Sequence, residues 1–402
     1  MSHSLAIAGA LLVSALVLGV AAEWALRRAI RSGRYYVWPP RRRQVLMLDR
    51  RAHPQLEPYV RIEINRDGER GGGVPRAGRT FRVLVAGGSA VECYLLDQDA
   101  TWPGVLERKL QRPEHIDRLG ADRVHVGNIG RSGVDSQTLD LILKRVLPNY
   151  DRLDLIIIMV GASDVVRWLM IGAPADRAAP PVPLDRFFSR YPEVRFGWSP
   201  RRWALAEWVR RLRDLRPTRQ ANACSWYVRY RLMRAQASEV RDELPEPTVM
   251  LRAFEHHFRS ILGRARAHAG RVLVVRQPWF EKEDYTADEL ALLWSGGVGE
   301  AYYDQISIYY SNQVINKLMA QINSRVVQVA GEMGVEQHDL MALIERSAAS
   351  FIDHFHFTAA ACEVIAEAVC AAIVGPAEGK DPIPRCFGGP CGLTSSPHPH
   401  GR

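Results

Sequence analysis

The stretch that most constrains the fold of this chain is residues 81–93, which read FRVLVAGGSAVEC. A short apolar run that ends in Gly87 and Gly88 is typical of a buried strand of a parallel sheet followed by a sharp turn. Ser89 follows that turn, at the end of the strand where open α/β sheets bind their ligands. Two interpretations are open for Ser89: a nucleophile at the mouth of a crevice, or the N-cap of the next helix.

From residue 81 onward the pattern alternates between strands and helices. We expect strands at 82–86, 124–128, 154–160, 271–276 and 335–338, and helices at 100–112, 136–147, 249–269, 305–333 and 358–373. Alternating elements with continuous apolar strands predict an α/β fold, in which helices cover both faces of a parallel sheet. Ahead of this domain, residues 35–80 are predicted to be a linker with an accessory strand or hairpin that includes residues 60–64.

The N-terminal region is predicted to be a membrane anchor with a basic flank, residues 1–34. Residues 5–22 carry no charge, which makes them long and apolar enough for a transmembrane helix, and four arginines follow by residue 34. A cleaved signal peptide is the alternative, but residues 1–4 lack the usual positive charge. The positive-inside rule would keep the arginine flank, and hence the main domain, in the cytoplasm.

Residues 166–248 interrupt the strand–helix alternation. Residues 171–194 are rich in proline and predict a long loop, and a helix is expected over 202–215. This helix combines apolar residues with several arginines: Trp203, Trp208, Val209, Leu212 and Leu215 stand against Arg202, Arg210, Arg211 and Arg213. Its apolar face either lies on a membrane surface or, as is commoner, packs on the domain and leaves the arginines in solvent.

Charge and cysteine content narrow the function only a little. The formal net charge of +9 over 402 residues suits anionic headgroups, nucleic acid or an acidic glycan alike. We expect no nucleic-acid binding, because the arginine-rich segment 199–241 matches no known module and acidic residues interrupt it. None of the six cysteines forms a CxxC pair, so no structural zinc site is expected.

The C-terminal tail, residues 376–402, is predicted to be disordered. Within it, Cys386 and Cys391 either form a small disulfide loop or remain free thiols, and both alternatives are open. His398 and His400 are too isolated to make a metal site.

Three further polar blocks follow predicted elements: NIGRSG at 128–133, GASD at 161–164 and FIDHFHFT at 351–358. A serine nucleophile needs a base, a group that orients the base, and donors for the oxyanion. An aspartate three residues ahead of a histidine in one turn, as Asp353 is to His356, can accept from Nδ1–H and leave Nε2 free to take the serine proton. His354 competes for the role of base, and Gly133 offers an N–H with no Cβ beside it.

The four blocks, in this order, resemble those of the SGNH hydrolase superfamily, also called GDSL-type esterases. The resemblance covers about residues 81–375, with 166–248 as an insertion. It implies a flavodoxin-like three-layer α/β/α fold with a five-stranded parallel sheet. It also implies Ser89 as nucleophile, His356 as base and Asp353 as its orienter, with no metal or organic cofactor. The oxyanion hole would consist of the N–H groups of Ser89 and Gly133 and the hydroxyl of Ser163.

Two positions depart from the family pattern. The first block reads Gly-Gly-Ser where Gly-Asp-Ser is common, which is a harmless variation. Ser163 stands where the family's oxyanion-hole asparagine is expected, and serine is shorter and offers one rotatable O–H instead of a fixed amide. Losing such a donor altogether typically costs about 2.7–4 kcal/mol.

The resemblance implies a membrane-anchored serine esterase that removes O-acyl groups, most plausibly O-acetyl, from a glycan or lipid. Relatives with such tethers often act outside the cytoplasm, so we place the domain on the extracytoplasmic side of a bacterial-type inner membrane, against the charge rule. Two alternatives remain: an O-acyltransferase that uses the same triad, and a non-catalytic glycan-binding module on the same fold. The presence of Ser89, Asp353 and His356 argues against the second. The oligomeric state stays open.

Overall fold

The computed structural model describes residues 2–75 and 77–375. The predictions for the tail at 376–402, including Cys386, Cys391, His398 and His400, lie outside the described residues.

The centre of the molecule is a sheet of five parallel strands in the order β10-β8-β5-β3-β4. The strands are β3 (Thr80–Gly87), β4 (Arg123–Asn128), β5 (Leu153–Met159), β8 (Ala269–Val275) and β10 (Glu336–His338). All five predicted strands are confirmed, with small shifts at their ends. Of these five strands, β3 comes first along the chain and lies inside the sheet, and β4 comes second and lies at its edge. This is the flavodoxin-like order.

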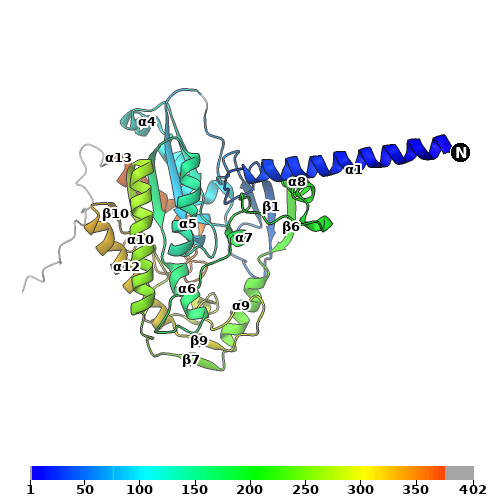
Figure 1. The fold of residues 1–402 in the computed structure, drawn as a ribbon. Helices are drawn as coiled ribbons and strands as arrows, with labels where there is room; N and C mark the ends of the chain where they lie inside the picture. The colour runs from blue at the N-terminus through cyan, green and yellow to red at the C-terminus, as the bar shows by residue number, and fades with distance from the viewer. Residues whose placement is uncertain (1, 76, 376–402) are drawn as a thin grey trace, which may run out of the picture.

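Helices cover both faces of this sheet, so the predicted three-layer α/β/α architecture is confirmed (Figure 1). One face packs against α3 (Trp102–Leu110) and α13 (Ala359–Val374). The other packs against α5 (Ser136–Val146), α10 (Thr248–His268) and α12 (Asn312–Glu332). Alternation along the strands explains the two cores: Val83 and Val85 face the first layer, and Leu84 and Ala86 face the second.

The predicted start of one helix is wrong. We expected a helix from residue 305, but α12 begins at Asn312, because Ile308–Tyr310 form strand β9 and pair with β7 (Glu239–Arg241). An isoleucine followed by two tyrosines favours a strand once a partner strand is present. That partner comes from the 166–248 insertion, far away in sequence. Ser311 then ends the strand and caps α12, since its side chain accepts from the backbone N–H of Val314.

A second, three-stranded sheet joins the N-terminal region to the insertion. β1 (Arg43–Leu48) pairs antiparallel with β2 (Tyr59–Glu63), the predicted accessory strand, and parallel with β6 (Thr218–Ala223). The insertion also contains α8 (Ala204–Arg213), within the predicted range 202–215, and α9 (Trp226–Ala235). The shorter helices are α2 (Ser89–Glu92), α4 (Pro113–Leu119), α6 (Ala162–Met170), α7 (Leu184–Phe187) and α11 (Ala287–Leu290), and 3-10 turns cover 98–100, 147–149 and 200–202.

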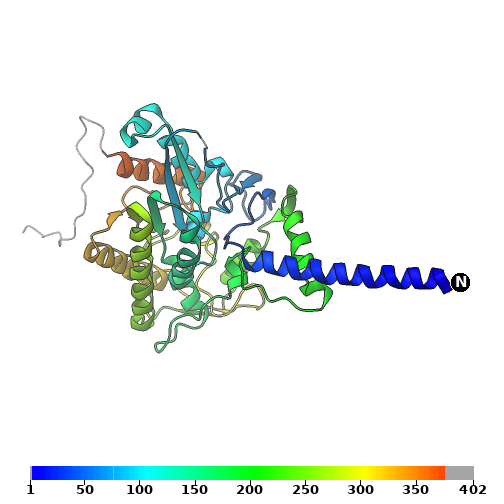
Figure 2. The same cartoon turned by 45° about the horizontal axis from the view of Figure 1, so that its top comes forward.

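The N-terminal helix α1 (Ser2–Arg31) extends away from the body of the molecule (Figures 1 and 2). Residues 7–22 are exposed along its length. The helix is long and apolar enough to cross a membrane, and a signal sequence has the same properties. Among residues 7–31, the last turns of the helix touch the domain, through Glu23, Arg27 and Ile30.

Candidate active site

Ser89 lies directly after the central strand β3, on a turn that only glycine permits. A Cβ on Gly87 would come within 2.1 Å of the backbone oxygen of Met159 on the neighbouring strand β5. The chain therefore turns sharply against β5, and Ser89 becomes the first residue of α2. The N-cap of that helix is Gly88. The interpretation of Ser89 as an N-cap is therefore wrong, and its side chain faces a pocket instead.

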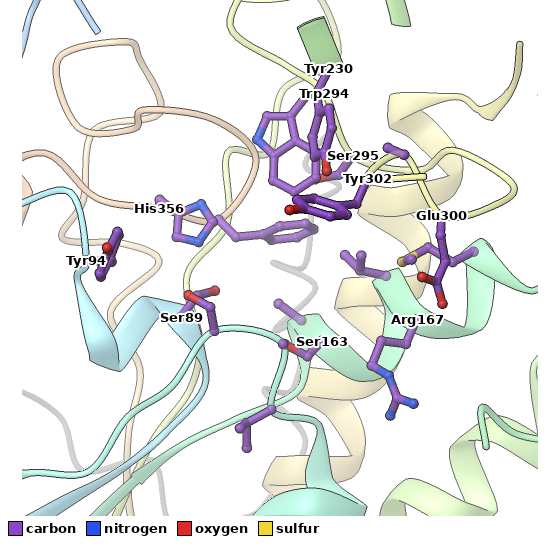
Figure 3. A pocket seen from close by; sticks show the side chains of 18 of the residues that line it. Ser89, Tyr94, Ser163, Arg167, Tyr230, Trp294, Ser295, Glu300, Tyr302 and His356 are labelled. Carbon is purple, nitrogen blue, oxygen red and sulfur yellow. The ribbon is translucent and has the colours of Figure 1, made fainter. Parts of the chain in front are cut away.

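This pocket, of about 760 Å³, brings together residues from all four sequence blocks. Ser89, Gly133, Ser163 and His356 line it. Figure 3 shows the imidazole of His356 directed at the side chain of Ser89, with Ser163 nearby at the start of α6. The pocket opens at the carboxyl ends of β3 and β5, where the strand order reverses. That switch point is where open α/β sheets bind their ligands.

Asp353 lies behind His356 and is fully buried. A tight loop places the two side by side: Phe351 and Phe357 form an antiparallel bridge, and Ile352 N–H donates to the oxygen of His356 at 2.8 Å. His356 Nδ1 lies 2.8 Å from both carboxylate oxygens of Asp353. Asp353 Oδ1 also accepts from the backbone N–H of Phe355 at 2.9 Å. A carboxylate at Nδ1 keeps the proton there and leaves Nε2 as an acceptor on the pocket side.

Asp353 and His356 each stabilise the charged form of the other. Burial alone would raise the pKa of Asp353, but the charge of His356 and the hydrogen bonds to the carboxylate bring it below its usual value. Burial alone would lower the pKa of His356, and the charge and hydrogen bond of Asp353 raise it instead. Asp353 is therefore an ionised carboxylate, and His356 is more basic than a free histidine.

His354, the alternative base, faces a different part of the molecule. Its side chain is buried, and its Nε2 lies 3.0 Å from Asn312 Oδ1 on α12. Burial lowers its pKa to about 3. A neutral, enclosed imidazole that contacts an asparagine is a structural residue, whereas His356 lines the pocket.

Trp294 is a member of the site that the sequence analysis missed. Its indole Nε1–H donates to Asp353 Oδ2 at 2.7 Å, and its ring lines the pocket. It lies in the segment between α11 and β9, far from the Asp353 loop in sequence, and no spacing signal connects the two. A helix of the insertion supports the same loop, because Arg231 on α9 donates to the backbone oxygens of Leu292 and Ile352 at 3.1 and 3.3 Å.

Gly133 adopts a left-handed backbone conformation, with φ +75°, and the space around its Cα is open. Glycine is therefore the natural residue at this position of the pocket wall. The loop before it is fixed to α2: Ser132 Oγ donates to Glu92 at 2.5 Å, and Asn128 Nδ2 donates to the oxygen of Val91 at 2.8 Å. Burial raises the pKa of Glu92.

A buried arginine binds the chain just after α2. The guanidinium of Arg70 donates to the backbone oxygens of Cys93 and Leu96 at 3.0 and 2.6 Å. Nothing in the motif pattern pointed to Arg70, since it lies in the predicted linker ahead of β3. Its contacts fix the segment at the end of the helix that carries Ser89, and Arg70 does not line the pocket itself.

Ser163 is the second residue of α6, whose N-cap is Gly161. A Cβ on Gly88 would lie 3.5 Å from Ser163 Oγ, so this hydroxyl sits close to the turn that carries Ser89. The start of α6 is held on two sides: Ala162 N–H donates to Gln277 Oε1 at 3.2 Å, and the Asp164 carboxylate accepts from Ser136 N–H at 3.0 Å. Burial raises the pKa of Asp164 to about 7. Asp164 thus binds the start of α5 and does not cap its own helix.

Aromatic side chains form much of the remaining wall. Tyr94, Trp226, Tyr230 and Tyr302 line the pocket together with Trp294, and Arg167 and Glu300 supply charge at its far end (Figure 3). Flat aromatic faces combined with a few polar groups suit a ligand that has both apolar faces and hydroxyl groups. Across residues 2–75 and 77–375, no group of three His, Cys, Asp or Glu residues is placed to hold a metal ion.

No protein-family model and no curated protein matches the chain. Among solved structures, it is similar to LAE5, an α/β hydrolase enzyme from the metagenome of Lake Arreo, Spain, at 12% identity over 73% of this chain and 96% of that one, with a TM-score of 0.41. Axe2, an acetylxylan esterase from Geobacillus stearothermophilus, matches at 14% identity over 74% and 94% of the two chains, with a TM-score of 0.39.

A member of the lipolytic G-D-S-L family from Veillonella parvula matches at 10% identity over 73% and 97% of the two chains, with a TM-score of 0.38. The case for an activity of this chain rests on the geometry of its own pocket. With its flavodoxin-like strand order and four sequence blocks at one edge of the sheet, the chain is an α/β/α protein similar to the SGNH hydrolases, which include the GDSL-type esterases.

Proposed function

We propose that the protein is a serine esterase that removes O-acyl groups, in particular O-acetyl groups, from a carbohydrate or lipid. The observation that carries this proposal is the hydrogen-bonded pair of Asp353 and His356, whose imidazole shares one pocket with Ser89. The aromatic walls of the pocket favour a carbohydrate substrate over a substrate that offers only an apolar acyl chain. The helix α1 would hold the enzyme in a bacterial-type inner membrane, with the catalytic domain on the extracytoplasmic side.

The reaction would begin with attack by Ser89 Oγ on the ester carbonyl carbon, while His356 Nε2 takes the hydroxyl proton. The negative charge that develops on the carbonyl oxygen would be met by the N–H groups of Ser89 and Gly133 and by the Ser163 hydroxyl. His356 then returns the proton to the leaving alkoxide, which departs as a free hydroxyl and leaves an acyl-serine.

Water would resolve this intermediate in the second half of the reaction. His356 takes a proton from the water as it attacks the acyl carbon, and then gives that proton to Ser89 Oγ as the free acid leaves. Asp353 holds the imidazole in place throughout and stabilises its charged form. These residues use no metal or organic cofactor for either half.

The test is hydrolysis of p-nitrophenyl acetate by the full chain in detergent, beside its Ser89→Ala variant. We expect release of p-nitrophenol and of one free acetate for each ester cleaved, and loss of at least about 10³-fold in kcat in the variant. Turnover that persists in a folded Ser89→Ala protein would contradict the nucleophile. Acetate that appears only on an added sugar would identify the acyltransferase, and two folded but inactive proteins would favour the binding module.

A further inference from the structure

The surface beside the base of α1 is apolar, basic and rich in tryptophan. An exposed stripe consists of Leu205, Trp208 and Leu212 on one face of α8 and of Leu215 in the turn that follows the helix, and each of these residues is more than 40% exposed. The prediction that the apolar face of this helix packs on the domain is wrong for Trp208 and Leu212, which are exposed, whereas Val209 is half-buried. Ala204 and Glu207 make the buried side of α8 instead.

The contacts between α1 and α8 determine where this surface lies relative to the apolar run of α1. Glu23 is the first charged residue after the apolar run of α1, and its carboxylate accepts from the backbone N–H groups of Ala204 and Leu205 at 2.7 and 3.1 Å. The eighteen residues before Glu23 extend about 27 Å as a helix, close to the roughly 30 Å of a bilayer core. The start of α8 therefore lies at the level where α1 would leave the hydrocarbon.

Further contacts brace α8 and its preceding loop against the anchor. Arg27 donates to Glu23 at 2.8 Å and to the oxygen of Gly197 at 2.7 Å. Its guanidinium also lies 4.7 Å from the ring centre of Trp198. Both views place α8 beside the base of α1 (Figures 1 and 2).

The residues around this junction are those that favour a membrane interface. Trp24 and Trp198 are 65% and 70% exposed, and Trp203 lies next to the N-terminus of α8. Tryptophan concentrates where hydrocarbon meets headgroups. Exposed arginines surround the same surface, at positions 28, 31, 201, 202, 210 and 213. These arginines suit the phosphate groups of anionic lipids.

We propose that α8 and residues 196–203 form a second membrane contact, in which the stripe of Leu205, Trp208, Leu212 and Leu215 lies in the headgroup boundary of an anionic bilayer. Such interfacial helices bury their apolar face by about 5–10 Å. This contact, together with α1, fixes the tilt of the domain and holds its pocket near the lipid surface. The proposal rests on α1 as a membrane span and is independent of which chemistry the pocket performs.

The test uses nitroxide labels on the full chain, reconstituted into vesicles of phosphatidylcholine and phosphatidylglycerol. Cys386 and Cys391 are first replaced by serine, since the other four cysteines are buried. Labels are placed one at a time through Leu212→Cys on α8, Val364→Cys on α13, and Leu12→Cys on α1. Val364 is the matched control, because it is 40% exposed, as Leu212 is at 42%, and lies on the helix layer away from α1.

We expect the Leu212 label to be more accessible to oxygen than to a water-soluble nickel chelate, as the Leu12 label is, and the Val364 label to show the reverse order. In phosphatidylcholine alone, the Leu212 label should lie closer to water, since the arginines lose their anionic partners. Equal depth in both vesicles would overturn the role of the arginines.

Three other results would overturn the contact itself. A Leu212 label in water while the Leu12 label is in lipid would leave the anchor intact and remove the interfacial helix. Strong spin–spin coupling between Leu212 labels would mean that a second copy of the chain covers the stripe. A Leu12 label in water would remove the anchor as well, without bearing on hydrolysis of p-nitrophenyl acetate.

Discussion

Ser163 is the residue on which the rate of the proposed reaction most depends, because it stands where a fixed amide donor is usual. Its hydroxyl lies near the turn that carries Ser89, at the edge of the pocket. We predict that Ser163→Ala lowers kcat by about 10- to 100-fold, below the 10²–10³-fold loss typical of a dedicated oxyanion donor. KM should change little, because the donor acts mainly on the charge that develops in the transition state.

The measurement is steady-state hydrolysis of a small acetyl ester. The matched control is Ser324→Ala on α12, whose hydroxyl only donates to the backbone oxygen of Ala320. A Ser163→Ala enzyme with the parent kcat would show that the two backbone N–H groups suffice. In that case, the difference between serine and asparagine at this position has no catalytic cost.

His356 and Asp353 together predict a pH profile. Attack by Ser89 requires neutral His356, so kcat/KM should rise with pH through the pKa of His356. Asp353 raises that pKa, so the midpoint should lie above the ordinary value of about 6.5. Asp353→Asn removes the charge, so the midpoint should move to lower pH while the plateau falls by about 10⁴-fold.

The profile is measured as kcat/KM from pH 5 to 9 for both proteins. Loss of rate without a downward shift of the midpoint would mean that Asp353 positions the ring but does not set its basicity. A parent midpoint below the ordinary value would show that burial outweighs the carboxylate.

At the scale of elements, the insertion supports the loop 351–357 through a side chain of α9. Arg231 on α9 donates to the backbone oxygens of Leu292 and Ile352, which connects α9 both to the Asp353 loop and to the segment that carries Trp294. We predict that Arg231→Ala lowers kcat by about 10-fold and speeds amide hydrogen exchange at residues 352–356, because the loop loses its outer support.

The control for this prediction lies on the same helix. Arg229 donates to the backbone oxygen of Asp304 on the exposed side, and Arg229→Ala should leave both kcat and exchange at 352–356 unchanged. If both variants behave alike, the effect belongs to the stability of α9 and not to the loop.

The elements of the main sheet were predictable because each carries its own signal. Apolar runs bounded by glycine marked β3 and β5. In the structure, Asp135 and Thr358 cap the start of α5 and α13, where each accepts from a backbone N–H group. β6, β7 and β9 carry no such signal, since their hydrogen bonds are made with partners far away in sequence. The prediction of a helix from residue 305 was wrong because pairing with a distant strand outweighs local propensity.

At the scale of the whole molecule, the parallel sheet explains why the sequence motifs predict the position of the pocket. All strands run the same way, so the blocks that follow β3, β4 and β5 meet at one edge. Residues next to the smaller sheets also line the pocket: Tyr309 lies on β9, and Cys224 directly follows β6. α1 extends away from the body of the molecule beside α8 (Figure 1).

The sequence by itself determined the α/β class, the five strands of the sheet, and the grouping of Ser89, Gly133, Ser163 and His356 at one pocket, since these depend on local apolar runs, turns and chain order. Tertiary structure alone decided which histidine faces the pocket, which residues support the pair, and which face of α8 is exposed. Trp294 reaches Asp353, Arg231 reaches the 351–357 loop and Glu23 caps α8 across long separations in sequence. A single sequence carries no periodic signal for such contacts, because they form only when distant segments pack together.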